Sequence, residues 1–491
     1  MGRALLLFSM ALPLYAAGLA DRVQALLDAS PVARTSFWGV RIVDLDRNAI
    51  WFESNSNRLF VPASNAKLFT TALALMRLGP EYRFQTRVLA DRPPGDGGEV
   101  DELRFVGGGD PNLSGRVVPY RMGAPPGNPL AAVEDLAGQV YARGIRSVAG
   151  DVVGDDTAYV WEPYPEGWGL HDSVWDYGAA IGALSINDNA VAVTVLPGDR
   201  EPAPARILLA PPVEYYQIDN RVRTTAGPRK ISIERLPGSQ QVRVWGGVPP
   251  KDPGSTELLG IDDPALYAAC ALRDALARRG VAIRGAARAL HLYPNQAGDL
   301  RKGPVAAPGP GVELAVRESA PLLEDLRITD KTSQNLHAEM ALRAVARARR
   351  QIGSREAGLA EMQAFLDEAG IERGSYRLAD GSGLSRSDLV SPAAMVRLLA
   401  YLYESKLREQ WLSLLPTGGE DGTLHARFVR TPAAGNIYAK TGTLAHTSAL
   451  SGYARRKDGH MLAFSILVNN YDVPASEVRA LMDRICTLMV Q

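Results

Sequence analysis

A serine and a lysine one helical turn apart stand near the start of the chain. Ser64 and Lys67 belong to the segment PASNAKL (62–68), which opens a stretch with the apolar spacing of a helix. A spacing of three places both side chains on one helix face, so the amine can reach the hydroxyl. A serine hydroxyl is a weak nucleophile, and a lysine of lowered pKa can serve as its base. The pair could support serine-based covalent catalysis, but alone it is weak evidence, because Ser-x-x-Lys arises often by chance and a serine here can be only an N-cap.

Two other short motifs carry polar groups of the same kind. Ser333 and Asn335 stand in the run Ser-Gln-Asn within a region of helical pattern. If the backbone turns there, a hydroxyl and a carboxamide can point into one cleft. Taken alone, this run is more typical of a solvated polar helix turn.

The third motif is the run Lys-Thr-Gly-Thr inside a strand-like stretch near the C-terminus. Lys440 and Gly442 share one face of that strand, and Thr441 and Thr443 share the other. The glycine lets another chain lie close to the backbone, and an exposed strand edge can hold a peptide. Alone, the run is more typical of an ordinary strand with a surface lysine.

These motifs must be positioned by a core built from both ends of the chain. Strand-like runs at 37–45 and 50–53 are matched by runs at 437–444, 449–455 and 461–469, so the two ends could share one sheet. Helical spacing marks 65–78, 321–349, 357–369 and 475–490. We therefore expect one discontinuous core of residues 21–80 and 291–491.

The middle of the chain differs in character from both ends. Short strand-like runs such as 84–90, 103–106, 190–196 and 231–236 are separated by frequent Gly and Pro. This pattern favours small β-rich modules that are looped out of the core. We divide it into one inserted domain of residues 81–165 and 251–290, and a second of residues 166–250.

The N-terminus has the pattern of a secretory signal peptide. A positive start is followed by an apolar run of about 14 residues and a small-x-small site, which predicts cleavage after Ala20. A membrane-spanning helix needs about 20 apolar residues, so an anchor is the weaker interpretation. We expect residues 1–20 to be removed, leaving a periplasmic or secreted protein without a membrane span.

Charge and residue counts exclude several classes of protein. The 491 residues carry 54 basic and 54 acidic side chains, a balance that lacks the electrostatic footprint of a nucleic-acid binder. The only two cysteines, Cys270 and Cys486, lie in helix-like apolar stretches and fit buried free thiols, although one bridge is possible. The six histidines show no metal-binding spacing, so we expect neither metal nor cofactor.

Together and in this order, the three motifs match the signature of penicillin-binding proteins and class A β-lactamases. The chain resembles the low-molecular-mass class C penicillin-binding proteins, the D-alanyl-D-alanine carboxypeptidase/endopeptidase family. Its further matches run from about residue 35 to the C-terminus: GGGDP (107–111), GDVV (150–153), DGSGLSR (380–386) with Ser391-Pro392, and DGTL (421–424). The resemblance implies a transpeptidase/β-lactamase-like α/β (α+β) core, with an antiparallel sheet flanked by helices and two inserted β-rich domains.

The resemblance also implies a role for each motif residue. Ser64 attacks the D-Ala-D-Ala carbonyl, Lys67 takes its proton, Ser333 relays a proton to the leaving amine, and Asn335 holds the substrate amide. The backbone N–H groups of Ser64 and Thr443 form the oxyanion hole, with Gly442 between Thr443 and the carboxylate-binding pair Lys440 and Thr441. Asp155, or its neighbour Asp156, and Arg386 occupy the positions expected to bind the diaminopimelyl end of the stem peptide.

The expected activity is a serine-type D-Ala-D-Ala carboxypeptidase that acts on peptidoglycan stem peptides, with D,D-endopeptidase action on cross-links as an additional activity. β-Lactam antibiotics are expected to be covalent inhibitors. A β-lactamase is the alternative enzyme, although the large insertion and the lack of a Glu-type deacylation motif argue against it. A non-catalytic peptidoglycan-binding or β-lactam-sensing protein is the alternative from another class.

Overall fold

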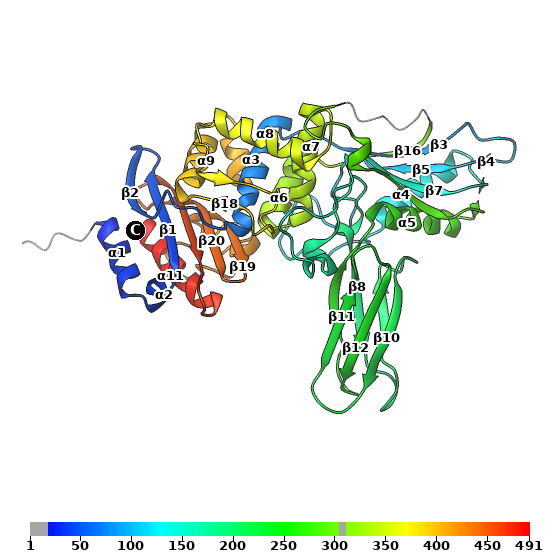
Figure 1. The fold of residues 1–491 in the computed structure, drawn as a ribbon, viewed down its shortest axis with the longest axis horizontal. Helices are drawn as coiled ribbons and strands as arrows, with labels where there is room; N and C mark the ends of the chain where they lie inside the picture. The colour runs from blue at the N-terminus through cyan, green and yellow to red at the C-terminus, as the bar shows by residue number, and fades with distance from the viewer. Residues whose placement is uncertain (1–17, 304–310) are drawn as a thin grey trace, which may run out of the picture.

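The computed structural model describes residues 18–303 and 311–491. Figure 1 shows an elongated molecule with a sheet and helices at one end, a second sheet at the other, and a narrow β module that projects sideways. The expected signal peptide lies outside the described residues, except for its last three positions. Of these, Leu19 and Ala20 begin the first helix, α1 (Leu19–Ala29).

The core sheet is antiparallel and joins the two ends of the chain. Its five strands, in spatial order, are β19 (Ile437–Leu444), β20 (Thr447–Arg455), β21 (Met461–Asn469), β1 (Phe37–Asp44) and β2 (Ala49–Ser54). One apolar cluster packs the sheet against α1, α2 (Pro31–Arg34) and α11 (Ala475–Met489). The prediction that strands from both ends share one sheet is confirmed.

The opposite face of the core sheet carries a helical layer. Its elements are η1 (Ala63–Ala66), α3 (Lys67–Leu78), α6 (Leu322–Thr332), α7 (Asn335–Arg350), α8 (Arg355–Glu368), α9 (Pro392–Glu404), α10 (Arg408–Leu414) and η6 (Gly422–Leu424), with the short hairpin β17 (Tyr376–Arg377) and β18 (Leu389–Val390). Buried side chains of α3, α7, α8 and α9 form one continuous apolar cluster. The expected helix over 321–349 is two helices, α6 and α7, which are separated at Ser333 and Gln334.

A second five-stranded sheet lies beyond α7. Its strands, in spatial order, are β15 (Ala287–Leu292), β7 (Val152–Val160), β5 (Leu103–Val106), β3 (Gln85–Ala90) and β16 (Val312–Glu318). A smaller sheet accompanies it, with the order β14 (Ala282–Ile283), β6 (Ser147–Val148) and β4 (Glu99–Val100). This part also contains α4 (Ala131–Ala142) and α5 (Pro264–Arg278), so the inserted region is less purely β than its Gly and Pro content indicates.

The projecting module consists of two three-stranded sheets. One has the order β13 (Ser255–Gly260), β8 (Ala190–Leu196) and β9 (Arg206–Ala210), and the other β10 (Gln217–Thr224), β12 (Gln241–Val248) and β11 (Lys230–Arg235). Because β13 pairs with β8, and β16 pairs with β3, we propose domain limits different from those expected at 250 and 291. The projecting module then extends to Gly260, and the other inserted domain to Glu318.

Both cysteines are buried and unpaired, Cys270 in α5 and Cys486 in α11. The expectation of free thiols is therefore confirmed. Within residues 18–303 and 311–491, no helix has the length and apolar character that crossing a membrane requires.

Candidate active site

Ser64 stands at a tight turn where η1 leads into α3. The preceding Ala63 has φ of 48°, a left-handed conformation that is costly for a residue with a side chain. Gly383 packs against this turn, and a Cβ there would lie 1.9 Å from the Ala63 carbonyl oxygen. The side-chain amide of Asn65 donates a hydrogen bond of 2.9 Å to the backbone carbonyl of Lys440. These contacts fix the serine between a loop and β19.

The Lys67 amine lies directly beneath the serine. Its Nζ is 3.0 Å from Ser64 Oγ, 2.5 Å from Asn335 Oδ1 and 2.6 Å from the carbonyl oxygen of Ser382. Burial lowers the pKa of this amine from 10.5 to about 8, against the opposing effect of Asp380 and Asp330. A neutral amine has two protons and one lone pair. It can therefore donate to Asn335 and Ser382 while it accepts the Ser64 hydroxyl proton.

The break between α6 and α7 brings the second motif to the same place. Ser333 adopts a left-handed conformation with φ of 65° and ends α6, and Asn335 begins α7. The Asn335 Nδ2 donates to the Tyr177 carbonyl oxygen at 2.8 Å, and its second proton is left for a substrate. Helical spacing alone could not place this break, because the residues on both sides continue the helical pattern.

The third motif lies on β19, the strand that borders the site. The Lys440 Nζ donates to Ser333 Oγ at 2.8 Å and to the Thr441 carbonyl oxygen at 3.0 Å. Burial and the neighbouring Lys67 lower the pKa of the Lys440 amine, while Asp330 opposes that shift. With its oxygen engaged by Lys440, the Ser333 hydroxyl is free to donate its own proton toward the cleft.

Gly442 is where β19 and the serine turn come closest. A Cβ at this position would lie 2.8 Å from the Pro62 carbonyl oxygen and 3.1 Å from the Ser64 amide nitrogen. Any side chain would therefore push the strand away from Ser64. The glycine keeps the backbone N–H of Ser64 beside the strand that carries Thr443, which is the arrangement that two oxyanion-hole donors need.

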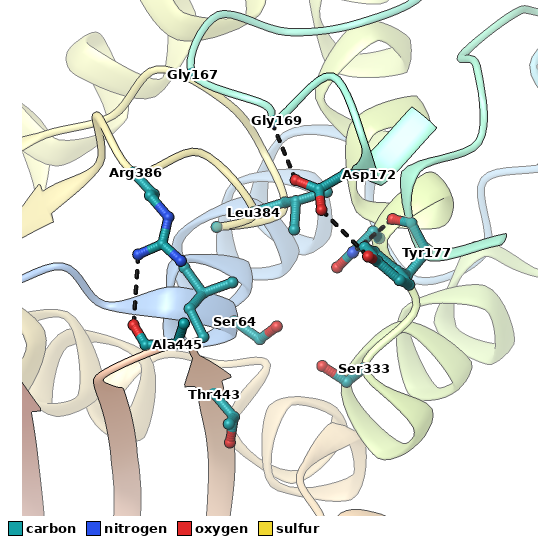
Figure 2. Close-up of a pocket in the computed structure, with 13 residues that line it drawn as sticks. Ser64, Gly167, Gly169, Asp172, Tyr177, Ser333, Leu384, Arg386, Thr443 and Ala445 are labelled. Carbon is teal, nitrogen blue, oxygen red and sulfur yellow. Dashed lines mark hydrogen bonds between the residues drawn. The ribbon is translucent and has the colours of Figure 1, made fainter. Parts of the chain in front are cut away.

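A cavity of about 510 Å³ opens above these groups. Figure 2 shows Ser64 and Ser333 facing the same space above Thr443, with Arg386 at one side and Asp172 and Tyr177 at the other. The lining residues are Ser64, Gly167, Gly169, Asp172, Tyr177, Ser333, Asn335, Gly383, Leu384, Arg386, Thr443, Leu444 and Ala445. Lys67 and Lys440 are fully buried behind this surface.

The side chain of Asp155, expected to bind the substrate, does not line the cavity. Asp155 is fully buried, and its carboxylate accepts hydrogen bonds from the backbone and hydroxyl of Thr157. Asp156 is also buried and pairs with His291 at 2.8 Å. Both stand on β7, an interior strand of the second sheet, so neither side chain reaches the cavity.

Asp172 is the carboxylate that lines the cavity, and sequence reasoning missed it. It lies in η2 (Asp172–Val174) and accepts from the Gly169 N–H at 3.0 Å and from the Tyr177 hydroxyl at 3.2 Å. Its segment is rich in Gly and Trp, but no spacing rule connects it to the three motifs. Arg386 does line the cavity as expected, and its guanidinium donates to the Ala445 carbonyl oxygen at 3.4 Å.

Lys67 is buried against Ser64, Lys440 contacts Ser333, and β19 borders both pairs. This arrangement is that of a serine hydrolase of the penicillin-binding type. The chain belongs to the D-Ala-D-Ala carboxypeptidase 3 (S13) family, which it matches over residues 19–489. It is accordingly a serine-type D-Ala-D-Ala carboxypeptidase. This confirms the family, the fold class and the enzyme class expected from the sequence.

Individual relatives match nearly the whole chain. The D-alanyl-D-alanine carboxypeptidase of Actinomadura sp. (strain R39) is 33% identical over 471 residues, which cover 93% of this chain and 82% of that protein. The D-alanyl-D-alanine carboxypeptidase DacB of Haemophilus influenzae is 25% identical, and the match covers 96% of this chain and 92% of that protein. The crystal structure of penicillin binding protein 4 (dacB) from Haemophilus influenzae shares the fold, with a TM-score of 0.80 and 24% sequence identity. The match covers 95% of this chain and 98% of that protein.

Proposed function

We propose that this chain removes the terminal D-alanine from peptidoglycan stem peptides through an acyl-enzyme on Ser64. The main support is the 3.0 Å contact between the Lys67 amine and the Ser64 hydroxyl at the edge of the cavity. Lys67 takes the hydroxyl proton as Ser64 Oγ attacks the peptide carbonyl carbon. The negative oxygen that forms is stabilised by the backbone N–H groups of Ser64 and Thr443.

The leaving D-alanine is handled by the second and third motifs. Ser333 donates its proton to the leaving amine as the carbon–nitrogen bond breaks, and Lys440 restores that proton. Lys440 and Thr441 attract the terminal carboxylate, and Asn335 holds the amide of the peptide. Water then hydrolyses the ester. The same steps cut a D-Ala–diaminopimelate cross-link when the leaving amine belongs to a neighbouring stem, which is the proposed endopeptidase activity.

Arg386 and Asp172 are proposed to recognise the diaminopimelyl end of the stem. A zwitterionic end offers a carboxylate to the exposed guanidinium and an ammonium to the carboxylate. We expect Arg386→Ala and Asp172→Asn each to raise the KM for a diaminopimelate-containing stem peptide about tenfold. Their rates of acylation by penicillin should stay near the wild-type value. An equal loss toward penicillin and peptide would contradict this assignment.

The fate of a penicillin adduct separates this function from its alternatives. Intact mass spectrometry should show one antibiotic added to the protein within minutes, and the adduct should decay over hours. D-Alanine should be released from a stem pentapeptide in a parallel assay. Rapid loss of the adduct with antibiotic turnover would indicate a β-lactamase instead. Rapid acylation without peptide turnover would indicate a β-lactam-sensing protein.

The site of action is proposed to lie outside the cytoplasm, in the periplasm or in the secreted fraction. The support is the N-terminal pattern of a positive start, an apolar run and a small-x-small site. Peptidoglycan stem peptides and β-lactam antibiotics are the proposed partners there.

A further inference from the structure

A second hollow adjoins the active-site cavity on the side opposite Arg386. It has a volume of about 420 Å³, and the described residues that line it are Trp175, Asp176, Tyr177, Thr256, Glu257 and Leu258. We call it the β13 groove, because half of these residues belong to β13, an edge strand of the projecting module. Tyr177 lines both spaces, so an occupant of the groove can be joined to a peptide in the active site.

The groove has fixed walls. The backbone of Trp175 forms a β-bridge with Leu259, and a Cβ at Gly260 would lie 2.7 Å from the Trp175 carbonyl oxygen. The Trp175 indole N–H donates to His171 Nδ1 at 3.1 Å. The buried Arg235 of β11 also contacts the Ser173 carbonyl oxygen, which ties the Asp172–Tyr177 segment to the projecting module. The side chains of Trp175 and Tyr177 therefore belong to a segment that is held in place by contacts with the projecting module.

The chemistry of the groove fits a sugar better than a peptide. Tyr177 is 43% exposed and Leu258 46%, so an aromatic and an aliphatic surface are both open to the groove. Aromatic and aliphatic surfaces of this kind pack against the C–H faces of sugar rings. Asp176 and Glu257 can accept hydrogen bonds from hydroxyl and acetamido groups. The groove lining includes no basic side chain, so a stem peptide with several carboxylates would be repelled there.

We propose that the β13 groove binds N-acetylated sugar rings of the glycan strand to which the stem peptide is attached. This inference rests on the proposed function, because the peptidase reaction places the stem peptide in the adjoining cavity. Binding energy from this distant part of the substrate would hold the peptide over Ser64. The projecting module thereby becomes part of the substrate-binding surface.

The test compares two ligands that differ only in the sugar. Binding of a disaccharide-pentapeptide and of the same pentapeptide without the disaccharide is measured by calorimetry with the Ser64→Ala protein, which cannot consume them. We expect the disaccharide-pentapeptide to bind about tenfold more tightly. Glu257→Gln combined with Leu258→Ser should remove this preference and leave the affinity for the sugar-free peptide unchanged.

The control is Leu208→Ser on β9, the opposite edge strand of the same sheet, where the leucine is also open to solvent. It should leave both affinities unchanged. Equal affinity for the two ligands, or a preference that survives the Glu257 and Leu258 changes, would overturn the proposal. So would an equal loss of affinity for both ligands, because the groove would then bind peptide. D-Alanine release by the wild-type protein is assayed separately, so a failure of the peptidase function remains distinguishable.

Discussion

Ser64→Ala is expected to abolish the penicillin adduct and to lower kcat/KM for D-alanine release about 10⁵-fold or more. The physical reason is that the Ser64 hydroxyl opens into the cavity and has the Lys67 amine, its proposed base, at 3.0 Å. Without that oxygen, no ester can form. The adduct is measured by intact mass and the D-alanine by a coupled assay.

The fold should survive this change. After Ser64→Ala, the Lys67 amine keeps its hydrogen bonds to Asn335 Oδ1 and to the Ser382 carbonyl oxygen. The circular dichroism spectrum and Tm should therefore stay near those of the wild-type protein. Ser387→Ala, on the neighbouring loop but outside the cavity lining, is the matched control and should be acylated normally. An adduct of one antibiotic mass on Ser64→Ala would assign the nucleophile to another residue.

The Ser64–Lys67 contact and the order of residues along β19 could be predicted from the sequence because local spacing determines them. Three residues in a helix put Ser64 and Lys67 on one face, and alternation along a strand orders Lys440 to Thr443. The core strands were predictable as short apolar runs bounded by turn residues, and β1, β20 and β21 are buried along nearly their whole length. The contact between Lys440 and Ser333 joins residues 107 positions apart, and only the ordered set of motifs indicated it.

The far side of the cavity could not be predicted in this way. Asp155, which was expected to bind the substrate, lies on β7. This strand is covered on both sides and its residues are almost all buried, so the carboxylate cannot reach the cavity. Asp172 reaches the cavity through a segment of turns and short 3-10 helices, where no periodicity relates position to direction. The link between Asn335 and the Tyr177 carbonyl is a tertiary contact of the inserted region with α7. Such contacts depend on how the domains meet.

Lys67→Met is expected to slow acylation by penicillin about 10³- to 10⁴-fold, because it removes the general base and keeps a side chain of similar length. It should also change the pH dependence. A pKa of about 8 leaves about a tenth of the Lys67 amine neutral at pH 7, compared with far less for an ordinary lysine. The wild-type acylation rate should therefore rise about tenfold per pH unit below pH 8 and level off above it.

The acylation rate should fall as the pH is lowered, because only the neutral form of the Lys67 amine can act as a base. Protonated Lys67 has no lone pair for the Ser64 proton, so lowering the pH through its pKa removes the base and the rate falls. The Met variant lacks the group and should show no such limb, whereas Lys331→Met should retain it. Lys331 is a comparable control because it is also a buried lysine, paired with Asp421 at 2.6 Å outside the cavity. A rising limb near pH 8 that persists in Lys67→Met would show that another group activates Ser64.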